Sequence, residues 1–466
     1  MKNLLTLCLL ILVYTTQAQT AKISSTGKYY FVDLEGKQIK KLGSWKYAKS
    51  MDIYTGWMQV KDSNGVKFLL DKTGKTYKVA YQLKDIQSDT QALDLSQQSL
   101  TSLPAEVLQA TQLKVLLLHS TGLEVLPQTI AQLTNLECLN LRGNNLIELP
   151  STIGKLTRLK KLNLESNELT KLPATIGKLT KLESVNLNYN HLVALPASIG
   201  RLVNLKRLEI QDNQAQLSKI PTTIVKLTSL TTLILDGNPL KKLPANIGNL
   251  TNLTMLSLSG TSFRRLPVSI GKLVNLKGLY LADSQLEKLP ATIGKLKNLQ
   301  WLNLRYAPLS QLPPSFVQLK NLTSLNLSGH NFDKLPLEIL QLTGLTKLNI
   351  GASKLTELPP TFVQLANLTK LVLNRSLLKK LPPEIIQLKK LQKLDLSGNQ
   401  LTRLPATIVQ LKELRYLSLD RNQLKELPPN ITQLSKLTRL HLTSNPISRN
   451  TRQKIKQSLP KCKIQF

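Results

Sequence analysis

The chain has 466 residues, enough for several domains or one extended repeat array, and its 41% hydrophobic content excludes wholesale disorder. Lys and Arg number 62 against 28 Asp and Glu, so the formal net charge is +34. Only three cysteines occur, which excludes a fold built on a disulfide framework.

Residues 1–18 have the layout of a secretory signal peptide. The segment MKNLLTLCLLILVYTTQA has a Lys near its start, an apolar run of about ten residues and a small-residue ending, so we expect cleavage after Ala18. An uncleaved membrane anchor is the alternative, but the run is too short to span a bilayer comfortably. The sequence therefore predicts an exported protein that is secreted, periplasmic or held at the cell surface, with no transmembrane segment in the mature chain.

Residues 20–89 do not follow the pattern of the rest of the chain. They contain two similar stretches, GKYYFVDLEGKQIKK and NGVKFLLDKTGKTYK, each with an apolar and aromatic segment, a turn at Gly36 or Gly74, and a basic segment. This order predicts two copies of one β-hairpin. Both stretches resemble the bacterial WG-type β repeats, and the resemblance implies a small β-rich domain whose role the sequence does not give.

From residue 90 onward the chain repeats itself with a period of 23 residues, which indicates a solenoid. Residues 90–449 hold sixteen units, of which the last is truncated and the one at 205 is lengthened to 25 residues. The units begin at residues 90, 113, 136, 159, 182, 205, 230, 253, 276, 299, 322, 345, 368, 391, 414 and 437.

Each part of the unit has a physical task, and positions are numbered from its first Leu, as in LKKLNLESNELTKLPATIGKLTK at 159. The LxxLxL part alternates with period two, which predicts a short strand with Leu on one face. Asn at position 9 suits a tight turn, where its amide can satisfy backbone groups. The LPxxIxxL part predicts a short helical turn that Pro opens. One unit cannot bury its Leu face alone, so we expect stacked units, with a parallel sheet on one side and helical turns on the other.

The frame LxxLxLxxNxLxxLPxxIxxL resembles the leucine-rich repeat family, and its second half is similar to repeats of Ras-group-related plant proteins and Ras-binding scaffolds. The resemblance implies an α/β solenoid: a right-handed leucine-rich-repeat horseshoe with a parallel concave sheet, preceded here by the small β-rich domain. It also implies that ligands, usually proteins, bind on the concave face.

Residues 450–466 have the sequence NTRQKIKQSLPKCKIQF, which predicts a short helix and a final strand. A terminal repeat has to cover its exposed Leu core, so we interpret this segment as a C-terminal cap. Cys462 is expected to lie in the cap, where the distant Cys138 cannot reach it.

No catalytic, metal or cofactor motif emerges from the sequence. HExxH, GxSxG, GxGxxG and phosphate-loop patterns are missing, and the acids never form a pair unique to one place. The four His are scattered, with no Cys or His at metal-ligand spacing. The flanking segments are too small for an enzymatic partner domain. We therefore predict a non-enzymatic protein with no cofactor and no metal.

The positive charge recurs with the repeat, in TKLP, KKLP and GKL, which places Lys on turns and on the outer helical edge. One interpretation is a solvated, solubilising outer face. Another is attraction to an anionic polysaccharide or lipid surface of the cell envelope. Nucleic acid is disfavoured, because a nucleic-acid groove would cluster Lys and Arg and interleave stacking aromatics.

The unit at 299 departs from the frame, because Trp, Arg and Tyr replace small or charged residues. Throughout the repeats, Trp and Tyr take non-Leu positions of the strand segment, on or beside the concave face, whereas Phe takes core positions. Aromatic residues and Arg on an exposed, rigid surface are typical of interface hot spots. The predicted binding residues are Tyr280, Trp301, Arg305 and Tyr306, with Asp283 and Arg375 at the edge of this patch and Tyr189 and Tyr416 elsewhere on the face.

Two geometric expectations follow from the strand register. Tyr280 and Trp301 lie two positions apart on neighbouring strands, a diagonal of roughly 8 Å that long aromatics can bridge. Arg305 has only the small residues Ala282 and Ser328 beside it in its column, so its guanidinium is expected to stand clear.

Other changes in the neighbouring units have more than one interpretation. Position 9 lacks Asn in the six units from the one at 253 to the one at 368, and IGKL gives way to FVQL or IIQL from the unit at 299 onward. A duplication boundary without function, a binding patch and a change in curvature each account for this pattern.

The sequence thus predicts a recognition scaffold that binds a protein partner on the concave face. A binder of glycan or of an anionic envelope polymer, acting through concave aromatics and Lys, is one alternative. A structural envelope spacer is the other. No motif identifies the partner, the final compartment or the oligomeric state.

Overall fold

The structure of the chain is a computed structural model, which describes residues 20–24, 26–33, 37–49, 57–214 and 216–466. The chain divides into two compact units, Met1–Asn190 and His191–Phe466. The predicted signal peptide, residues 1–18, lies outside the described residues. Among the described helices, none is both long and apolar enough to cross a membrane.

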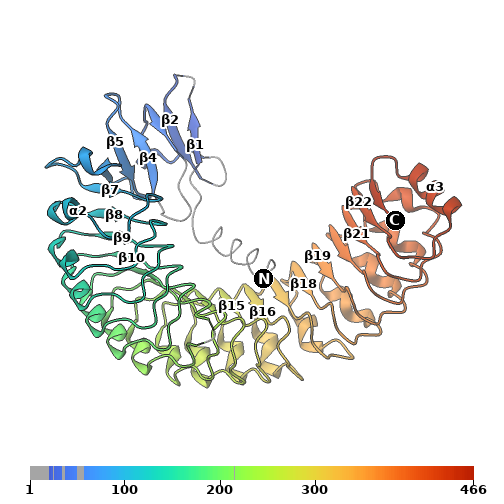
Figure 1. The fold of residues 1–466 in the computed structure, drawn as a ribbon. Coiled ribbons are helices and arrows are strands. Elements are labelled where there is room, and N and C mark those ends of the chain that lie inside the picture. Colours follow the sequence, from blue (N-terminus) through green and yellow to red (C-terminus); the bar gives the residue numbers. More distant parts are fainter. Residues whose placement is uncertain (1–19, 25, 34–36, 50–56, 215) are drawn as a thin grey trace. The chain divides into compact units, whose positions relative to one another are not determined.

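The first unit begins with antiparallel strands and continues into parallel ones (Figure 1). Its strands are β1 (Thr20–Ile23), β2 (Tyr29–Val32), β3 (Tyr47–Ala48), β4 (Met58–Lys61), β5 (Lys67–Leu70), β6 (Thr76–Ala80), β7 (Ala92–Asp94), β8 (Val115–Leu117), β9 (Cys138–Asn140), β10 (Lys161–Asn163) and β11 (Ser184–Asn186). β1 and β2 form a hairpin, and β3 to β6 form an antiparallel sheet. β6 also pairs in parallel with β7, which opens the parallel run to β11. The segment before the repeats and the repeats themselves therefore share a sheet.

The second unit is a stack of parallel strands, one for each repeat and one after them. Its strands are β12 (Arg207–Glu209), β13 (Thr232–Ile234), β14 (Met255–Ser257), β15 (Gly278–Tyr280), β16 (Trp301–Asn303), β17 (Ser324–Asn326), β18 (Lys347–Asn349), β19 (Lys370–Val372), β20 (Lys393–Asp395), β21 (Tyr416–Ser418), β22 (Arg439–His441) and β23 (Lys463–Gln465). Every neighbouring pair from β12 to β23 is parallel and in register.

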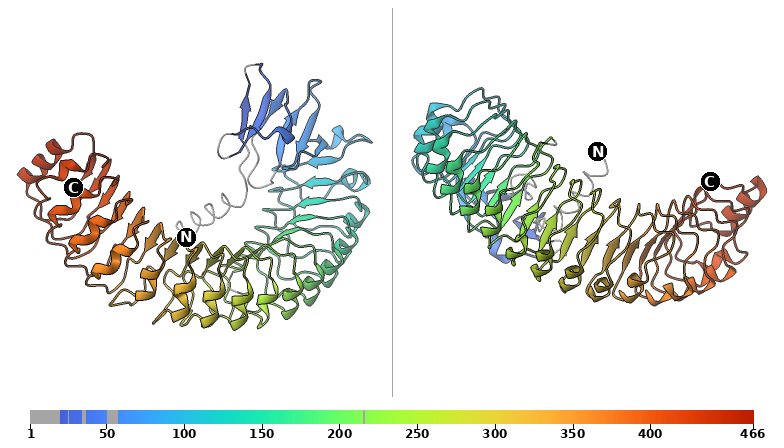
Figure 2. Two further views of the ribbon diagram at one scale, coloured as in Figure 1. Left: turned by 180° about the vertical axis from the view of Figure 1, so that it is seen from behind. Right: turned by 90° about the horizontal axis from the view of Figure 1, so that it is seen from below.

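In both units, short helices lie on the side of the stack opposite to the strands (Figure 2). The α-helices are α2 (Ala105–Gln109) and α3 (Arg449–Ser458). The 3-10 helices are η1 (Lys40–Leu42), η2 (Leu83–Asp85), η3 (Gln128–Gln132), η4 (Ser151–Lys155), η5 (Ala174–Lys178), η6 (Ala197–Arg201), η7 (Thr222–Lys226), η8 (Ile247–Asn249), η9 (Val268–Lys272), η10 (Ala291–Lys295), η11 (Pro314–Gln318), η12 (Leu337–Gln341), η13 (Pro360–Gln364), η14 (Pro383–Gln387), η15 (Ala406–Gln410) and η16 (Ile431–Gln433). In most repeats the helix begins directly after the Pro of LP, because a φ such as −66° at Pro173 leads the chain into a helical turn. The predicted alternation of strand and helical turn is confirmed.

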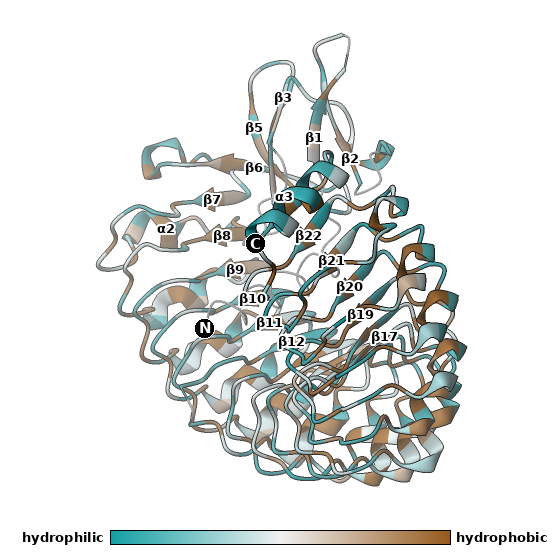
Figure 3. Cartoon of the chain, turned by 90° about the vertical axis from the view of Figure 1, so that its right-hand side faces the viewer, coloured by the Kyte–Doolittle hydropathy of each residue, from teal (hydrophilic) through white to brown (hydrophobic). Residues whose placement is uncertain are grey.

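The Leu frame forms the core between the strands and the helices. In the unit at 159, the apolar residues of the frame are at most 6% exposed, and Leu159, Leu164, Leu169 and Leu179 are fully buried. The Phe residues of the repeats also lie in this core, as predicted; Phe263, for example, has no exposed surface. The segment after the repeats holds the predicted helix and strand, α3 and β23. In Figure 3, α3 is largely hydrophilic, whereas β8 is hydrophobic throughout.

The residue at position 8 turns the chain out of each strand with a left-handed backbone. Its φ lies between 50° and 83° in the repeats, as at Ser166 (56°) and Gly329 (83°). Five units carry Gly at this position, because Gly adopts the left-handed region without steric cost. Four predicted binding residues belong to this turn column and not to the strands: Tyr189, Asp283, Tyr306 and Arg375.

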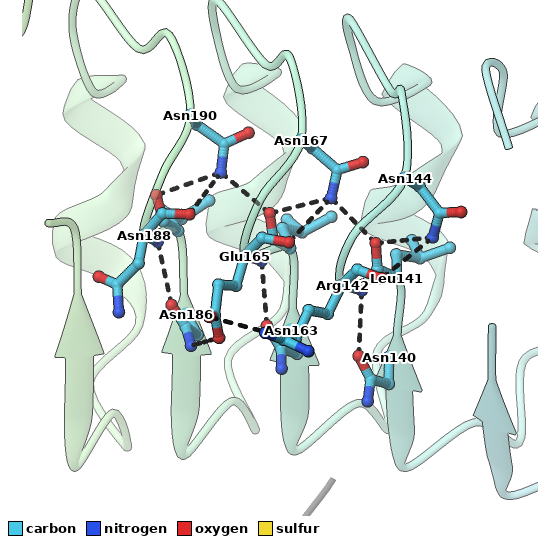
Figure 4. A network of polar contacts seen from close by, with 12 residues as sticks. Asn140, Leu141, Arg142, Asn144, Asn163, Glu165, Asn167, Asn186, Asn188 and Asn190 are labelled. Carbon is cyan, nitrogen blue, oxygen red and sulfur yellow. Dashed lines mark hydrogen bonds and ion pairs between the residues drawn. The ribbon is translucent and has the colours of Figure 1, made fainter. Parts of the chain in front are cut away.

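Asn at position 9 forms a buried column that joins neighbouring repeats of the first unit (Figure 4). The Asn167 amide donates to the carbonyls of Leu141 (2.9 Å) and Leu164 (3.1 Å). Its Oδ1 accepts the N–H of Leu146 at 3.1 Å. Since Leu141 and Leu146 belong to the preceding repeat, one Asn side chain satisfies its own turn and also ties two repeats together.

The strands before the first repeat cover the inner face of the first repeats, where "inner face" means the side chains at positions 3 and 5 of the strands. One buried cluster unites Trp57, Leu69, Tyr77 and Val79 with Ala92, Val115, Leu117 and Cys138 of the first three repeats. Trp57 is 3% exposed, its ring packs edge-on against Tyr77 at 5.4 Å, and the Lys161 Nζ lies 5.0 Å from it. The inner face of these repeats is therefore filled by the protein itself.

Candidate binding surface on the inner strands

Tyr280 and Trp301 occupy adjacent places on the inner face of β15 and β16. The register pairs Gly278 with Trp301 and Tyr280 with Asn303, which is the diagonal that the sequence predicts. Trp301 is 36% exposed and Tyr280 is partly buried.

Gly278 makes room for the Tyr280 ring. A Cβ on Gly278 would lie 3.0 Å from Cε2 and 3.4 Å from the hydroxyl of Tyr280, so the ring folds back over this glycine. Gly278 is also the register partner of Trp301. The missing side chain therefore leaves room for the Tyr280 ring beside the strand position that pairs with Trp301.

Arg305 and Tyr306 form a second pair at the opposite end of the same strand segment. The Arg305 guanidinium carbon lies 4.8 Å from the centre of the Tyr306 ring, a cation–π contact. The expectation that this guanidinium stands clear is therefore wrong, because the neighbouring ring attracts it. The Tyr306 ring is 45% exposed and lies against Gly329 of the next repeat, where any Cβ would overlap its Cδ1 atom.

Between these two pairs lies Asn303, which is 9% exposed and whose Oδ1 accepts the N–H of Arg305 at 3.2 Å. The structure thus places Tyr280 and Trp301 on the strands and Arg305 and Tyr306 on the following turn. We call these four residues the aromatic patch.

The other predicted binding residues lie outside the aromatic patch. Tyr189, 39% exposed, belongs to the first unit. Asp283 and Arg375 lie in the turn column of the second unit. Tyr416, on β21, is enclosed by other side chains: the Lys393 Nζ lies 4.3 Å from its ring centre, the Arg439 guanidinium 5.3 Å, and the His441 ring 5.2 Å.

The Asn column is interrupted on both sides of the aromatic patch. The hydroxyls of Thr261 and Ser284 donate only to their own unit, to Leu258 (2.6 Å) and Leu281 (2.7 Å), and Ala307 has no polar group to offer. These units consequently lack the tie that an Asn side chain makes to the preceding repeat.

His330 takes the Asn position in the next unit and is 1% exposed. Within the described part of the chain, neither ring nitrogen has a hydrogen-bond partner, although the ring packs on Phe332 at 5.0 Å. Burial lowers the pKa of His330 to about 4, because the charged imidazolium would lose its hydration.

Asp236 is a buried carboxyl at position 7 of the unit at 230, three repeats before the unit that contains Arg305. It is 5% exposed and accepts hydrogen bonds from the Ser257 hydroxyl and from the N–H of Ser259, both at 2.7 Å. Burial raises the pKa of Asp236 to about 7, and the nearby Asp212 acts in the same direction. The group is held by its own neighbours and is a structural carboxyl.

Sequence reasoning missed a column of cations at position 3 of the later strands. The residues at this position are Lys347, Lys370, Lys393, Arg439 and Lys463, with Tyr416 between the third and the fourth. The expectation that Lys lies on turns and the outer edge is therefore incomplete. The signal is visible when the same position is read from one repeat to the next: K, K, K, Y, R.

The described residues contain no cluster of His, Cys, Asp and Glu side chains that could hold a metal ion. In the same residues Cys138 and Cys462 are free thiols. Burial raises the pKa of both, so neither thiol has the lowered pKa of a reactive cysteine.

Family models match most of the repeat region. The model described as "Leucine-rich repeat region" matches residues 90–189, 150–236, 176–266 and 267–328, and the one described as "Leucine rich repeat" matches 343–401, 366–424 and 389–447. A solved leucine-rich-repeat protein of Leptospira interrogans is 38% identical, with a TM-score of 0.77, over 84% of this chain and 100% of that chain. The chain belongs to the leucine-rich repeat family, and its fold is the leucine-rich-repeat solenoid that the sequence predicts.

Two proteins of Listeria monocytogenes share this fold at lower identity. The internalin inlF is 21% identical with a TM-score of 0.52, over 68% of this chain and 84% of its own. The functional domain of InlJ is 21% identical with a TM-score of 0.57, over 78% of this chain and 72% of its own. A comparison with curated proteins gave no match.

Family membership carries a general expectation about function. Leucine-rich repeat proteins are typically non-enzymatic scaffolds, and the fold commonly mediates recognition between proteins. Stacked repeats create an extended, rigid inner surface whose variable positions are free to differ from unit to unit.

Proposed function

We propose that this protein is a recognition scaffold that binds a protein partner on the inner face of its second unit, through the aromatic patch. The observation that carries the proposal is Trp301, the one Trp of the repeats, which is 36% exposed at a strand position. Trp, Tyr and Arg are the residues that most often dominate the binding energy of protein interfaces.

The patch has the rigidity that such an interface needs. Trp301 is anchored on β16, and the Tyr280 ring is held over Gly278. The Tyr306 ring is held between Arg305 and Gly329. Because these side chains are positioned before a partner arrives, little conformational entropy is lost on binding.

The test is a pull-down from the envelope and medium of the producing organism. The wild type is compared with a Trp301→Ala/Arg305→Ala variant and with Val274→Ala as a matched control. Val274 is 47% exposed and follows η9 on the helical side. We expect one partner to be retained by the wild type and by the control and to be lost by the double variant. Equal recovery by all three would sink the proposal, provided that their circular dichroism melting curves coincide.

We also propose that the protein is exported and that residues 1–18 are removed. The support is the layout of the segment: a Lys, an apolar run and a small-residue ending at Ala18. N-terminal sequencing of protein recovered from the producing cells should begin at Gln19. Protein that retains Met1 throughout its purification would contradict this.

The domain division remains a proposal as well, with residues 20–89 before the repeats, 90–449 as the repeats and 450–466 as the C-terminal cap. It is supported by the change from antiparallel to parallel pairing at β6 and β7. Limited proteolysis that cuts first near residue 89 would support the first boundary, whereas resistance there would indicate one folding unit.

A further inference from the structure

Five cations stand in one column on the inner face of β18 to β23: Lys347, Lys370, Lys393, Arg439 and Lys463. Four of them, Lys347, Lys370, Arg439 and Lys463, are exposed at the first residue of their strand, and Lys393 is partly buried beside Tyr416. Neighbouring strands are ~4.8 Å apart, so the five strand-to-strand steps span about 24 Å. We call this set the cationic column.

The cations of the column are not neutralised by the protein. In the described ranges of the second unit, the ion pairs with Asp or Glu involve other residues, and none includes a member of the column. Burial and the like charges of Lys393 and Lys347 lower the pKa of Lys370. Like charges placed side by side are unfavourable, so an unliganded column destabilises the strands that carry it.

The nearest acids, Asp395 and Asp420, offset only part of the positive charge, because Asp395 acts on Lys370 but both acids also bind their own turns. Asp395 accepts the N–H and the hydroxyl of Ser397 at 3.1 and 2.7 Å. Asp420 accepts the N–H of Thr443 at 2.7 Å and lies 3.6 Å from the Nδ1 of His441. These carboxylates stabilise their own turns and leave the column with a net positive charge.

The single aromatic residue of the column is not available as a stacking platform. The Tyr416 ring has Lys393 at 4.3 Å, Arg439 at 5.3 Å and the His441 ring at 5.2 Å. Single-stranded nucleic acids are bound by cations together with free aromatic faces. Since Tyr416 serves to hold two cations, the column is suited to a ligand recognised by charge and not by stacking.

Four of the five cations are Lys, a compact point charge that pairs with a carboxylate without requiring the fixed fork geometry of Arg. We propose that the cationic column binds an extended acidic polypeptide segment, in which Asp or Glu at alternate positions faces the column. An extended chain advances ~3.3 Å per residue, so about seven residues match the 24 Å of the column. This site uses other strands than the aromatic patch and does not depend on the proposed function.

The experiment measures binding of a fluorescein-labelled Glu-Ser-Glu-Ser-Glu-Ser-Glu-Ser peptide to the purified mature chain by anisotropy at low salt. The column variant is Lys347→Gln/Lys370→Gln/Lys393→Gln. The control variant is Lys226→Gln/Lys272→Gln/Lys295→Gln, which removes the same charge from exposed Lys of the helical side. Val274→Ala serves as a second control. The peptide with Gln in place of Glu tests whether charge is needed, and a single-stranded oligonucleotide and polygalacturonate compete as other polyanions.

We expect the acidic peptide to bind the wild type, and the column variant to bind about tenfold more weakly, as three exposed ion pairs of ~0.5 kcal/mol predict. The control variant and Val274→Ala should stay within about twofold of the wild type. An equal loss in the two triple variants would overturn the proposal, because general charge would then explain binding. It is also overturned if the wild type does not bind, or if the oligonucleotide or polygalacturonate binds more tightly than the peptide in a column-dependent way.

Discussion

Position 3 of the strand segment has opposite environments at the two ends of the repeat region. In the first three repeats it is Ala92, Val115 and Cys138, all buried under Trp57 and its neighbours. In the later repeats it is the cationic column, at Lys347 and the strands that follow. The backbone frame is the same in both regions, since β8 and β19 are each strands of three residues.

The difference shows what each part of the repeat determines. The Leu positions build the solenoid, so they vary little. Position 3 points away from that core and therefore reflects what lies on top of it. It is apolar in the first three repeats, where another segment of the chain covers it, and it is mostly Lys or Arg in the last repeats, where most of these side chains are exposed. Each prediction below changes one side of this comparison, or the Asn column that joins the repeats beneath it.

Removing the Trp57 side chain, which covers the first repeats, should have the largest effect on stability. Trp57→Ala deletes a side chain that is 3% exposed and leaves a cavity over Cys138, so we expect a loss of about 3–5 kcal/mol in the stability of the first unit. Cys138, now buried, should also react faster with a thiol reagent in a mature chain that carries Cys462→Ser. Trp301→Ala is the matched control and should cost less than ~1 kcal/mol. Unchanged Cys138 reactivity would show that Trp57 is not its cover.

The buried Asp236 gives a pH-dependent effect in the uncovered second unit. Its pKa in the folded chain, about 7, lies above the ordinary 3.8, so between these values the native chain holds a proton that the unfolded chain releases. Stability should therefore fall as the pH rises from about 4 to about 7, by up to ~4 kcal/mol, and then stay level. Asp236→Asn should remove this slope and be more stable than the wild type at pH 8. Parallel pH profiles for both proteins would contradict the assignment.

Breaking the Asn column should lower the free energy of unfolding by less than the two changes above. Asn167→Ala leaves the Leu146 N–H without its acceptor inside the stack, for an expected loss of about 2 kcal/mol. The matched variant Ser284→Ala removes a hydroxyl that bonds only within its own unit, to Leu281, and should cost about 1 kcal/mol or less. Chemical denaturation of each variant measures the two losses of stability. A larger loss for Ser284→Ala than for Asn167→Ala would contradict the prediction.

Restoring the Asn column should give the smallest change in the free energy of unfolding, and this change should be stabilising. His330→Asn replaces a buried ring without hydrogen bonds by the side chain that other units use, for a gain of about 1 kcal/mol. The pKa of His330, about 4 in the folded chain, lies below the ordinary 6.5, so wild-type stability falls as the pH drops through this window. Thermal melting at pH 7 and pH 4.5 should show a larger difference for the wild type than for the variant. The prediction fails if the two proteins lose the same stability.

Most of the fold could be predicted from the sequence, because the sixteen repeats share one short pattern that predicts the same local structure each time. The alternation of Leu, the Pro before each helical turn and the Asn of the turn all lie within one short unit. The covering of the first repeats could not be predicted in the same way, since it depends on a tertiary contact between Trp57 and strands that follow it in the chain. The apolar residues Ala92, Val115 and Cys138, at a position that is mostly Lys or Arg in the last repeats, were the available signal.

The candidate site was predictable in composition but not in geometry. Exposure of Trp301 and its diagonal to Tyr280 follow from the period of the strands. The direction of the Arg305 side chain depends on the rotamer of its neighbour Tyr306, which in turn depends on Gly329 in the next repeat. Sequence alone does not fix such a chain of contacts, because each side chain has several low-energy rotamers.

The most direct measurement for the binding role of the inner face is photo-cross-linking in the producing organism. A benzophenone amino acid is placed at Trp301 in one protein and, as a control, at Val274 on the helical side in another. We expect a discrete cross-linked adduct from position 301 that is missing from position 274. The same adducts from both positions, or none from position 301, would contradict a partner on the inner face.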